Sequence, residues 1–244
     1  MRGMQVTDYM QMAEEVCLEL NIDLSSAQLR TMAVYIERLV AGLNQARLTG
    51  ESSVEDLFNK QIFDSLYLLK ILDIGTGRRI LDLGSGGGFP GIPLHIVLPG
   101  NDMVLLDSNK KKTTFLKNTV KALALQNIDI INGRAEEYGH IKEHRAGYDF
   151  VVSKAVAEMN VLVEYALPFL KTKGMAILFK GPRGDQELID AKAAIKECGG
   201  AFQEKYFYRL PGGEKRYLYL IIKKHATPQK YPRRAGVPSK NPLK

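Results

Sequence analysis

The stretch Ile80–Leu94, ILDLGSGGGFPGIPL, predicts the fold of this chain. An apolar run ends at Leu83, four glycines follow within five positions, and Phe-Pro-Gly leads back into apolar residues. This order is typical of the first strand-to-helix crossover in a parallel sheet, where ligands bind beyond the strand ends. Glycines leave room for a ligand beside the main chain and permit positive φ. The stretch therefore predicts a ligand cradle.

The spacing of the glycines narrows the kind of ligand. Gly84 and Gly86 begin a GxGxG pattern, and because the sixth position is Phe89 the GxGxxG dinucleotide fingerprint is not met. A Walker A loop is excluded because no Gly-Lys-Ser or Gly-Lys-Thr follows. The helix that opens with FPGIP is bulky and poor in the amide donors that a pyrophosphate needs. A cofactor without phosphates, such as S-adenosylmethionine, fits better than NAD.

Acidic residues occur at the next two predicted strand ends. MVLLD ends at Asp107, 23 residues after Gly84, where a carboxylate can accept both hydroxyl protons of an adenosine ribose. The third strand leads into GRAE at residues 133–136, which places an amide and an acid beside the expected adenine. Two acids at successive strand ends favour this interpretation over two solvated helix starts.

The rest of the chain alternates between strand-like and helix-like segments. From residue 78 the apolar runs RILDLG, MVLLD, IDIING, YDFVVS and GMAILFKG alternate with helical stretches, which predicts a parallel sheet covered on both faces. FQEKYFYRL and RYLYLIIKK, joined by PGGEK, predict a hairpin. Helices are expected near 5–20, 25–47 and 53–71, the second capped by Ser25. The expected organisation is therefore a helical extension over 1–73, an α/β domain over 74–224 and a tail over 225–244.

Composition excludes several classes of protein. With 244 residues, 45% hydrophobic and 25% charged, the chain has the composition of a globular protein. No apolar segment approaches the roughly 20 residues that span a bilayer, and the N-terminus lacks the apolar core of a signal peptide. A cytoplasmic protein without a membrane partner is expected. Cys17 and Cys198 lack CxxC spacing and the histidines lack ligand spacing, so neither a disulfide nor a metal site is expected.

The net charge of +7 lies at the end of the sequence. Residues 223–244 contain seven Lys or Arg and no acid, so the preceding residues are neutral. Four prolines in the same segment predict an extended or disordered tail rather than a helix. Basic tails usually contact polyanions, although a solubilising role is the alternative.

Several motifs together resemble one known family. LDLGSGGGFPGIPL, LLDS at 105–108, GRAEE at 133–137, YDFVVSKA at 148–155, FKG at 179–181 and the closing YPRRAGVPSKNP resemble the RsmG (GidB) family of bacterial 16S rRNA 7-methylguanosine methyltransferases. The resemblance covers nearly the whole chain. It implies a class I (Rossmann-like) methyltransferase fold with a seven-stranded, mostly parallel sheet and S-adenosylmethionine as the cofactor. It also implies methyl transfer to guanine N7 in 16S rRNA, free or within the 30S subunit. We expect the protein to be a monomer.

The same resemblance assigns individual residues. It implies that Gly84 and Phe89 line the cofactor pocket, that Ala135 and Glu136 meet the adenine, and that Lys154 contacts the cofactor region. The predicted cofactor-binding residues are Gly84, Gly86, Phe89, Asp107, Ala135, Glu136 and Lys154.

Three positions depart from the family's pattern. Lys154 stands where the family commonly has Arg, and the two are not equivalent at a bidentate contact. Arg47 stands at a position that is usually Asn, and Gln61 replaces a frequent His. These departures bear more on RNA docking than on cofactor binding.

The chemistry of guanine N7 agrees with the lack of a recognisable catalytic base or nucleophile in the sequence. N7 carries a lone pair and no proton, so methyl transfer needs alignment and no general base, and no catalytic residue is expected. An exocyclic-amine methyltransferase would commonly show Asn/Asp-Pro-Pro-aromatic after the fourth strand, where this chain has SKAV, and a cytosine C5 enzyme would need a nucleophilic Cys.

Basic residues at predicted strand ends and turns are the candidates for holding the substrate. Arg134, Lys180 and Arg216, together with Lys154, are expected to clamp phosphates or the base, although each alone resembles an ordinary surface charge. Lysines 110–112 could extend this patch. Two other functions stay open: an RNA-binding protein that keeps the cradle without catalysis, and an NAD-linked oxidoreductase, against which Phe89 argues.

Overall fold

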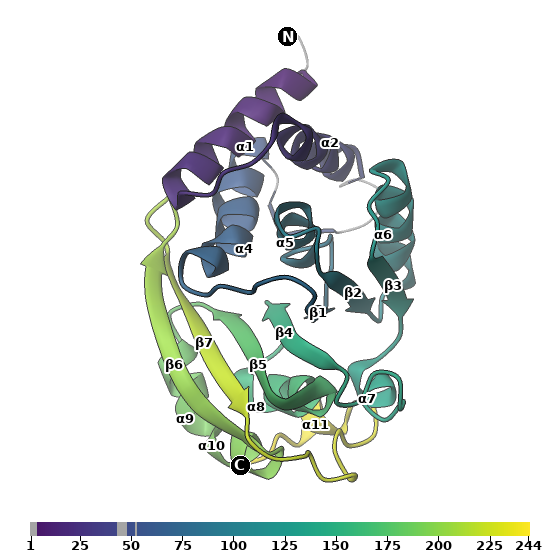
Figure 1. Cartoon of the computed structure of the whole chain (residues 1–244). Helices are drawn as coiled ribbons and strands as arrows, with labels where there is room; N and C mark the ends of the chain where they lie inside the picture. The colour runs from purple at the N-terminus through teal and green to yellow at the C-terminus, as the bar shows by residue number, and fades with distance from the viewer. Residues whose placement is uncertain (1–3, 43–47, 52) are drawn as a thin grey trace.

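A computed structural model describes residues 4–42, 48–51 and 53–244 and contains one mixed sheet (Figure 1). Its strands are β1 (Arg79–Leu83), β2 (Asp102–Asp107), β3 (Ile128–Asn132), β4 (Tyr148–Lys154), β5 (Leu170–Lys180), β6 (Gly200–Arg209) and β7 (Lys215–Lys223). The strand order is β3-β2-β1-β4-β5-β7-β6. β1 to β5 pair in parallel, whereas β7 pairs antiparallel with both β5 and β6. The predicted seven-stranded, mostly parallel α/β sheet and its hairpin are confirmed.

The strand order reverses direction beside β1, which creates a crevice at the carboxyl ends of the strands. β1 lies between β2 and β4, so the chain builds the sheet outward in one direction and then in the other. Leu83 pairs with Leu106, and Asp82 pairs with Val152, so the three strands end at a common edge. Open α/β sheets bind their ligands at this switch point. We call this side of the sheet the ligand edge.

Helices cover both faces of the sheet (Figure 1). They are α1 (Val6–Leu20), α2 (Ser26–Gly42), α3 (Val54–Asp56), the π-helical η1 (Leu57–Ile62), α4 (Phe63–Tyr67), the 3₁₀ turn η2 (Leu68–Lys70), α5 (Gly91–Val97), α6 (Lys110–Ala122), α7 (Ala135–Tyr138), α8 (Met159–Ala166), the 3₁₀ turn η3 (Leu167–Phe169), α9 (Gly184–Asp190), α10 (Lys192–Glu197) and α11 (Val237–Lys240). Ile80 of β1 belongs to the apolar cluster under α1, α2, α4 and α5. Leu81 and Leu83 belong to the cluster under α8 and α10. Strand alternation thus builds two cores from one strand.

The predicted N-terminal helices form, with one difference. Ser25 caps α2 through a reciprocal pair, because its Oγ accepts the N–H of Gln28 at 3.3 Å and the Gln28 Oε1 accepts the N–H of Ser25 at 3.1 Å. The third predicted helix is divided into α3, η1, α4 and η2. Residues 43–47, and with them Arg47, lie outside the described residues. The domain boundaries at 73 and 224 stay predictions.

The basic tail follows the surface of the folded core. The Arg145 guanidinium donates to the carbonyls of Thr227 and Tyr231 at 2.8 Å each, and Tyr231 is buried. The ammonium of Lys223 is also buried and donates to the Leu167 carbonyl at 2.6 Å. The expected extended path agrees with this, but the expectation of no helix is wrong, because α11 forms one short turn.

An ion pair fixes the tail to α8. The carboxylate of Glu164 is fully buried and accepts Arg233 Nε at 2.9 Å, Arg233 Nη2 at 2.7 Å and the Arg233 backbone N–H at 2.8 Å. A buried carboxylate that loses its cation is strongly destabilising. Two of the basic residues from 223–244, Lys223 at the end of β7 and Arg233 in the tail, therefore serve the fold.

Arg233→Met should lower the free energy of unfolding by roughly 3 kcal/mol, because it leaves the Glu164 carboxylate buried without its guanidinium. Urea denaturation measures the change. Arg234→Met is the matched control, since Arg234 is the exposed neighbour, and it should change stability by less than about 0.5 kcal/mol. Equal effects of the two substitutions would contradict a structural role for this ion pair.

The remaining structural observations concern thiols, metals and membranes. Cys17 and Cys198 are buried free thiols that belong to different apolar clusters. Within residues 4–42, 48–51 and 53–244, no group of three or more His, Cys, Asp or Glu side chains could hold a metal ion. In those same ranges no helix is long and apolar enough to cross a bilayer.

Candidate functional site

The chain turns sharply after β1, in a glycine turn formed by residues 84–88. φ is +78° at Gly84, +57° at Gly86 and +111° at Gly88, values that side-chain-bearing residues rarely adopt. Gly86 donates its N–H to Asp107 Oδ2 at 2.8 Å, which ties the turn to the end of β2. The predicted cradle after β1 and the predicted ribose-binding residue at the end of β2 are therefore in direct contact.

Three adjoining cavities run along the ligand edge. The β2–β3 cavity, about 260 Å³, is lined by Leu83, Gly84, Leu106, Asp107, Ser108, Lys112, Gly133, Arg134, Ala135, Glu136, Ala155, Val156 and Tyr165. The glycine-turn cavity, about 460 Å³, is lined by Leu48, Thr49, Gly50, Glu51, Gln61, Gly84, Ser85, Gly86, Gly87, Phe89, Lys112, Lys154 and Ala155. The β4–β5 cavity, about 500 Å³, is lined by Glu51, Lys60, Gln61, Asp64, Lys154, Ala155, Val156, Ala157, Glu158, Phe179, Lys180, Gly181, Arg183, Glu187 and Arg216.

The structure gathers the predicted cofactor-binding residues around the first two cavities. Asp107, Ala135 and Glu136 line the β2–β3 cavity, and Gly84 lines both it and the glycine-turn cavity. The glycine-turn cavity also holds the other three predicted residues, Gly86, Phe89 and Lys154. Their individual contacts with a cofactor stay predictions.

The space above Gly84 belongs to the protein itself. A Cβ on Gly84 would overlap Cγ2 of Val156, whose segment follows β4 and bends over the turn with Ala155 at a φ of +57°. A Cβ on Gly86 would instead stay 3.6 Å or more from its neighbours. The glycines were predicted to leave all of the missing side-chain volume to a ligand. The structure divides it, since Val156 takes the space at Gly84 and the surface at Gly86 stays accessible from the cavity.

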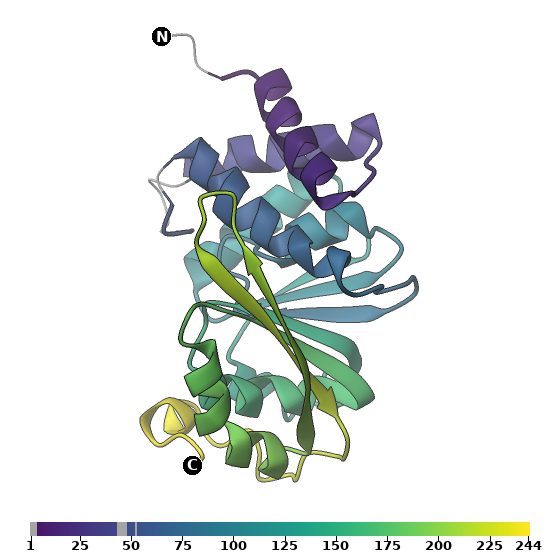
Figure 2. The same cartoon turned by 90° about the vertical axis from the view of Figure 1, so that its left-hand side faces the viewer.

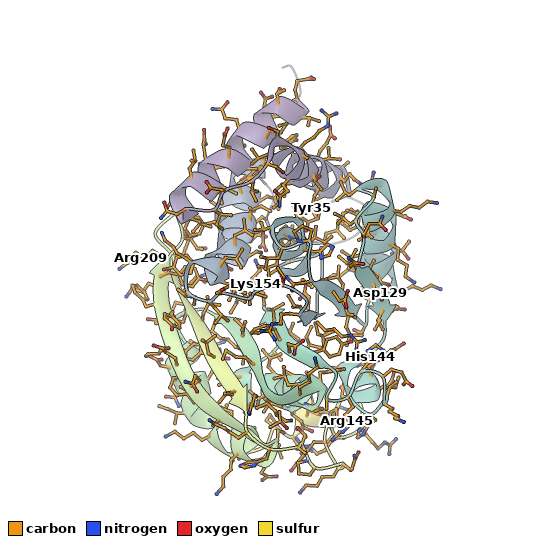
Figure 3. The ribbon with its side chains drawn as sticks, in the orientation of Figure 1. Tyr35, Asp129, His144, Arg145, Lys154 and Arg209 are labelled. Carbon is orange, nitrogen blue, oxygen red and sulfur yellow. The ribbon has the colours of Figure 1, made fainter. Side chains whose placement is uncertain are left out.

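Lys154 lies at the junction of two cavities (Figure 3). Its Nζ donates to Gln61 Oε1 at 2.6 Å, lies 3.5 Å from Asp64 Oδ2 and lies 5.2 Å from the centroid of the Phe89 ring. Burial lowers the pKa of Lys154, and the Asp64 carboxylate opposes that shift. The Tyr208 hydroxyl donates to the other oxygen of Asp64. Two of the departures from the family's pattern, Gln61 and Lys154, are thus hydrogen-bonded to each other.

The basic candidates do not form one group. Lys180 and Arg216 line the β4–β5 cavity with Lys154, whereas Arg134 lines the β2–β3 cavity. Lys180 Nζ is engaged by Glu187 Oε2 at 2.7 Å and by the Ala157 carbonyl at 2.6 Å. The guanidinium of Arg216 has no carboxylate partner among the described residues. Arg216 is therefore better placed than Lys180 to contact a polyanion.

The lysine run that opens α6 is also divided. Lys112 faces the first two cavities, while Lys110 and Lys111 line a separate cavity of about 730 Å³ between α2 and α6 together with Arg38 and Phe115. None of the described residues around that larger cavity belongs to a strand. This cavity therefore lies apart from the ligand edge, where cofactor and substrate binding are expected.

Comparison with known proteins identifies the same family that the sequence motifs resemble. Residues 28–209 match the family described as GidB, rRNA small subunit methyltransferase G. The chain belongs to this family. It is 42% identical over 226 residues to "Ribosomal RNA small subunit methyltransferase G" of Alkaliphilus oremlandii, covering 92% of this chain and 95% of the relative. The protein of the same name from Moorella thermoacetica is 40% identical over 223 residues, with 91% and 93% covered.

Solved structures support the GidB assignment at the level of the fold. An O-methyltransferase from Bacillus cereus in complex with SAH superposes with a TM-score of 0.58 at 15% identity, covering 90% of this chain and all of that one. TrmN from Thermus thermophilus superposes with a TM-score of 0.51 at 18% identity, covering 65% of this chain and 48% of that one. The Rossmann-like methyltransferase fold is confirmed.

Sequence reasoning missed two contacts of this GidB site. Glu136 Oε1 accepts the backbone N–H of Gly236 in the tail at 3.0 Å, so the tail holds a side chain that lines the β2–β3 cavity. Asp64, which contacts Lys154, lies in α4 and was not among the predicted site residues. Each contact joins segments about 90 to 100 positions apart, and no local pattern reports such a pairing.

Asp82, at the end of β1 just before the glycine turn, is a buried carboxyl group with a raised pKa. Its Oδ2 accepts the N–H of Gly91 at 2.9 Å, but its Oδ1 is buried without a partner among the described residues. Burial raises the pKa of Asp82 from 3.8 to about 7, against the Gly91 hydrogen bond and the attraction of Lys154, which lower it. Between these two values the folded chain holds a proton that the unfolded chain has released.

Stability should therefore fall as the pH rises through 7, because the Asp82 contribution is complete below pH 3.8 and is lost through the folded pKa. Between pH 5 and 8 the unfolding free energy of the wild type should drop by about 2 kcal/mol more than that of Asp82→Asn. Urea denaturation across this range measures both slopes. Asp23→Asn, at an exposed position between α1 and α2, should keep the wild-type slope. A wild-type slope in Asp82→Asn would refute the assignment.

Proposed function

We propose that this protein transfers a methyl group from S-adenosylmethionine to guanine N7 in small-subunit ribosomal RNA. The observation that carries the proposal is the row of adjoining cavities on a methyltransferase fold. At one end of the row the carboxylates of Asp107 and Glu136 suit a ribose and an adenine. At the other end Arg183 and Arg216 suit a phosphate or a guanine. Family membership supports the same reaction and the same class of RNA.

The residues of the first two cavities fit the cofactor. Asp107 Oδ2 and Oδ1 accept the N–H groups of Gly86 and Asn109 at 2.8 Å each. Each oxygen keeps a further lone pair with which it can accept a ribose hydroxyl. The open surface at Gly86 lets a ligand approach the main chain. We assign the adenosine to the β2–β3 cavity and the methionine part to the glycine-turn cavity.

The reaction makes few chemical demands on the side chains. When bound, S-adenosylmethionine supplies an electrophilic methyl group. Guanine N7 offers a lone pair and loses no proton, so the protein needs no general base. Holding two reactants in line can supply about 7 to 11 kcal/mol of a barrier. The role of Lys154, between the two cavities, is then to orient groups rather than to move protons.

Mapping 7-methylguanosine in small-subunit rRNA tests the proposal. Ribosomal RNA from cells that lack the endogenous activity should gain 7-methylguanosine after incubation with the protein and S-adenosylmethionine, either as free RNA or as assembled subunits. RNA that is bound without gaining a methyl group would favour the non-catalytic RNA-binding alternative. Methylation at another guanine atom would contradict the choice of N7.

Asp107→Ala should weaken S-adenosylmethionine binding by roughly 10-fold or more, because it removes charge-assisted hydrogen bonds to the ribose. Isothermal titration calorimetry measures the affinity. Asp102→Ala provides the matched control, because Asp102 begins the same strand and is exposed at the edge away from the site, and it should bind as the wild type does. An unchanged affinity in Asp107→Ala would remove Asp107 from the cofactor site.

A further inference from the structure

An aromatic ring stands out of the molecule on the edge strand β6. Phe207 is 50% exposed, and its ring lies among other aromatic and basic side chains of the hairpin. Its ring centroid lies 5.3 Å from that of Tyr217 across the β6–β7 ladder, and the Arg209 guanidinium lies 5.5 Å from the Phe207 centroid. Lys205 Nζ lies 5.8 Å from the centroid of Tyr217. Aromatic and basic side chains therefore alternate on one face of the hairpin.

This face is exposed because α9 stops short of it. Tyr219, two residues after Tyr217, is buried and donates its hydroxyl to Asp185 of α9 at 2.7 Å. α9 therefore covers only the Tyr219 part of this face. The opposite face of the hairpin is covered by α4, because Tyr208 stacks on Tyr67 of α4 with centroids 3.9 Å apart. The uncovered part is the hairpin patch, formed by Lys205, Phe207, Arg209, Lys215 and Tyr217.

The strand register places the hairpin patch at the ligand edge. Tyr217 pairs with Lys180 at the carboxyl end of β5, and Phe207 pairs with Tyr217. Two strand spacings of about 4.8 Å put Phe207 roughly 10 Å from Lys180, which lines the β4–β5 cavity. Figure 2 shows the hairpin from its open side, with its turn reaching the N-terminal helices. In Figure 3 the labelled Arg209 projects outward from this tip.

The charge of the hairpin patch is positive. Lys205 pairs with Asp185 at 2.7 Å, which neutralises one of its three cations. Arg209 and Lys215 have no carboxylate partner among the described residues. The nearby carboxylate of Glu214 is held by Lys60 at 3.3 Å. A row of rings flanked by free cations complements a polyanion that carries exposed aromatic bases.

We propose that the hairpin patch binds single-stranded RNA that flanks the target guanine, with one base stacked on Phe207 and its phosphates beside Arg209 and Lys215. The inference rests on the proposed rRNA substrate. Single strands offer unstacked bases to aromatic rings, whereas the bases of a duplex are already stacked. With the target in the β4–β5 cavity, the next nucleotide would pass over the start of β7 toward this ring.

The test measures how each variant binds a short fluorescein-labelled single-stranded RNA by fluorescence anisotropy. Phe207→Leu keeps apolar bulk but removes the ring, and it should weaken binding about 10-fold, the value of one base–aromatic stack. Phe207→Tyr keeps a ring and should bind as the wild type does. Arg209→Gln should lower the slope of log affinity against log salt by about one.

The chain offers a matched control at the other end of the same strand. Phe202 is also exposed, at 45%, but it pairs with Ile221 toward the edge opposite the ligand edge. Phe202→Leu should leave RNA binding unchanged. Equal effects of Phe202→Leu and Phe207→Leu, or no effect of either, would overturn the proposal. So would a wild-type dimer in light scattering that Phe207→Leu makes monomeric while RNA binding is unaltered.

Failure of this inference is distinguishable from failure of the proposed function. If the wild type forms 7-methylguanosine in rRNA and Phe207→Leu matches it in both RNA binding and methylation, the function stands and the hairpin patch is refuted. Calorimetry with S-adenosylmethionine should give wild-type affinity for every hairpin variant, which shows that the cofactor site is intact. If the wild type methylates no rRNA, the anisotropy comparison still decides whether the hairpin patch binds single-stranded RNA.

Discussion

The fold depends on close packing around the glycine turn. On the side away from the cavities, the Tyr35 hydroxyl of α2 donates to the Gly87 carbonyl at 2.9 Å. A Cβ on Gly88 would lie 2.9 Å from that hydroxyl, and one on Gly87 would lie 3.1 Å from Leu39. Side chains at these two positions would therefore require Tyr35 and Leu39 of α2 to shift. The same loop therefore admits the N-terminal helices on one side and faces the ligand edge on the other.

This arrangement joins three distant parts of the chain through buried polar groups. Lys154 at the end of β4 contacts Asp64 in α4, and Asp64 is held by Tyr208 from β6. The N-terminal helices and the C-terminal hairpin are consequently connected to Lys154, which lies between two of the cavities. The π-helical η1 contains Gln61, the hydrogen-bond partner of Lys154, and such irregular turns often occur at functional positions. The local irregularity in this helix thus coincides with the junction of two cavities.

Much of the fold could be predicted because its signals are local. Apolar runs, the glycine spacing and the PGGEK turn fixed the strands and the hairpin, and Ser25 marked the start of α2. The predicted residues at the ends of the first three strands could be grouped because parallel strands end at one edge. The Gly236–Glu136 bond and the place of Val156 could not be predicted, since both depend on how remote segments pack. The charge of the tail was visible, but its buried partner Glu164 was not.

The antiparallel strands β7 and β6 lie outside the parallel part of the sheet that forms the proposed cofactor site. The parallel strands β1 to β4 form the part of the fold that suits a nucleoside, whereas β7 and β6 return to the same edge outside it. The turn between them is exposed at residues 211–213, and exposed loop tips tolerate changes of length and composition. Insertions or exchanges in this turn would therefore alter the surface beside the proposed RNA contact and leave strands β1 to β4 unchanged.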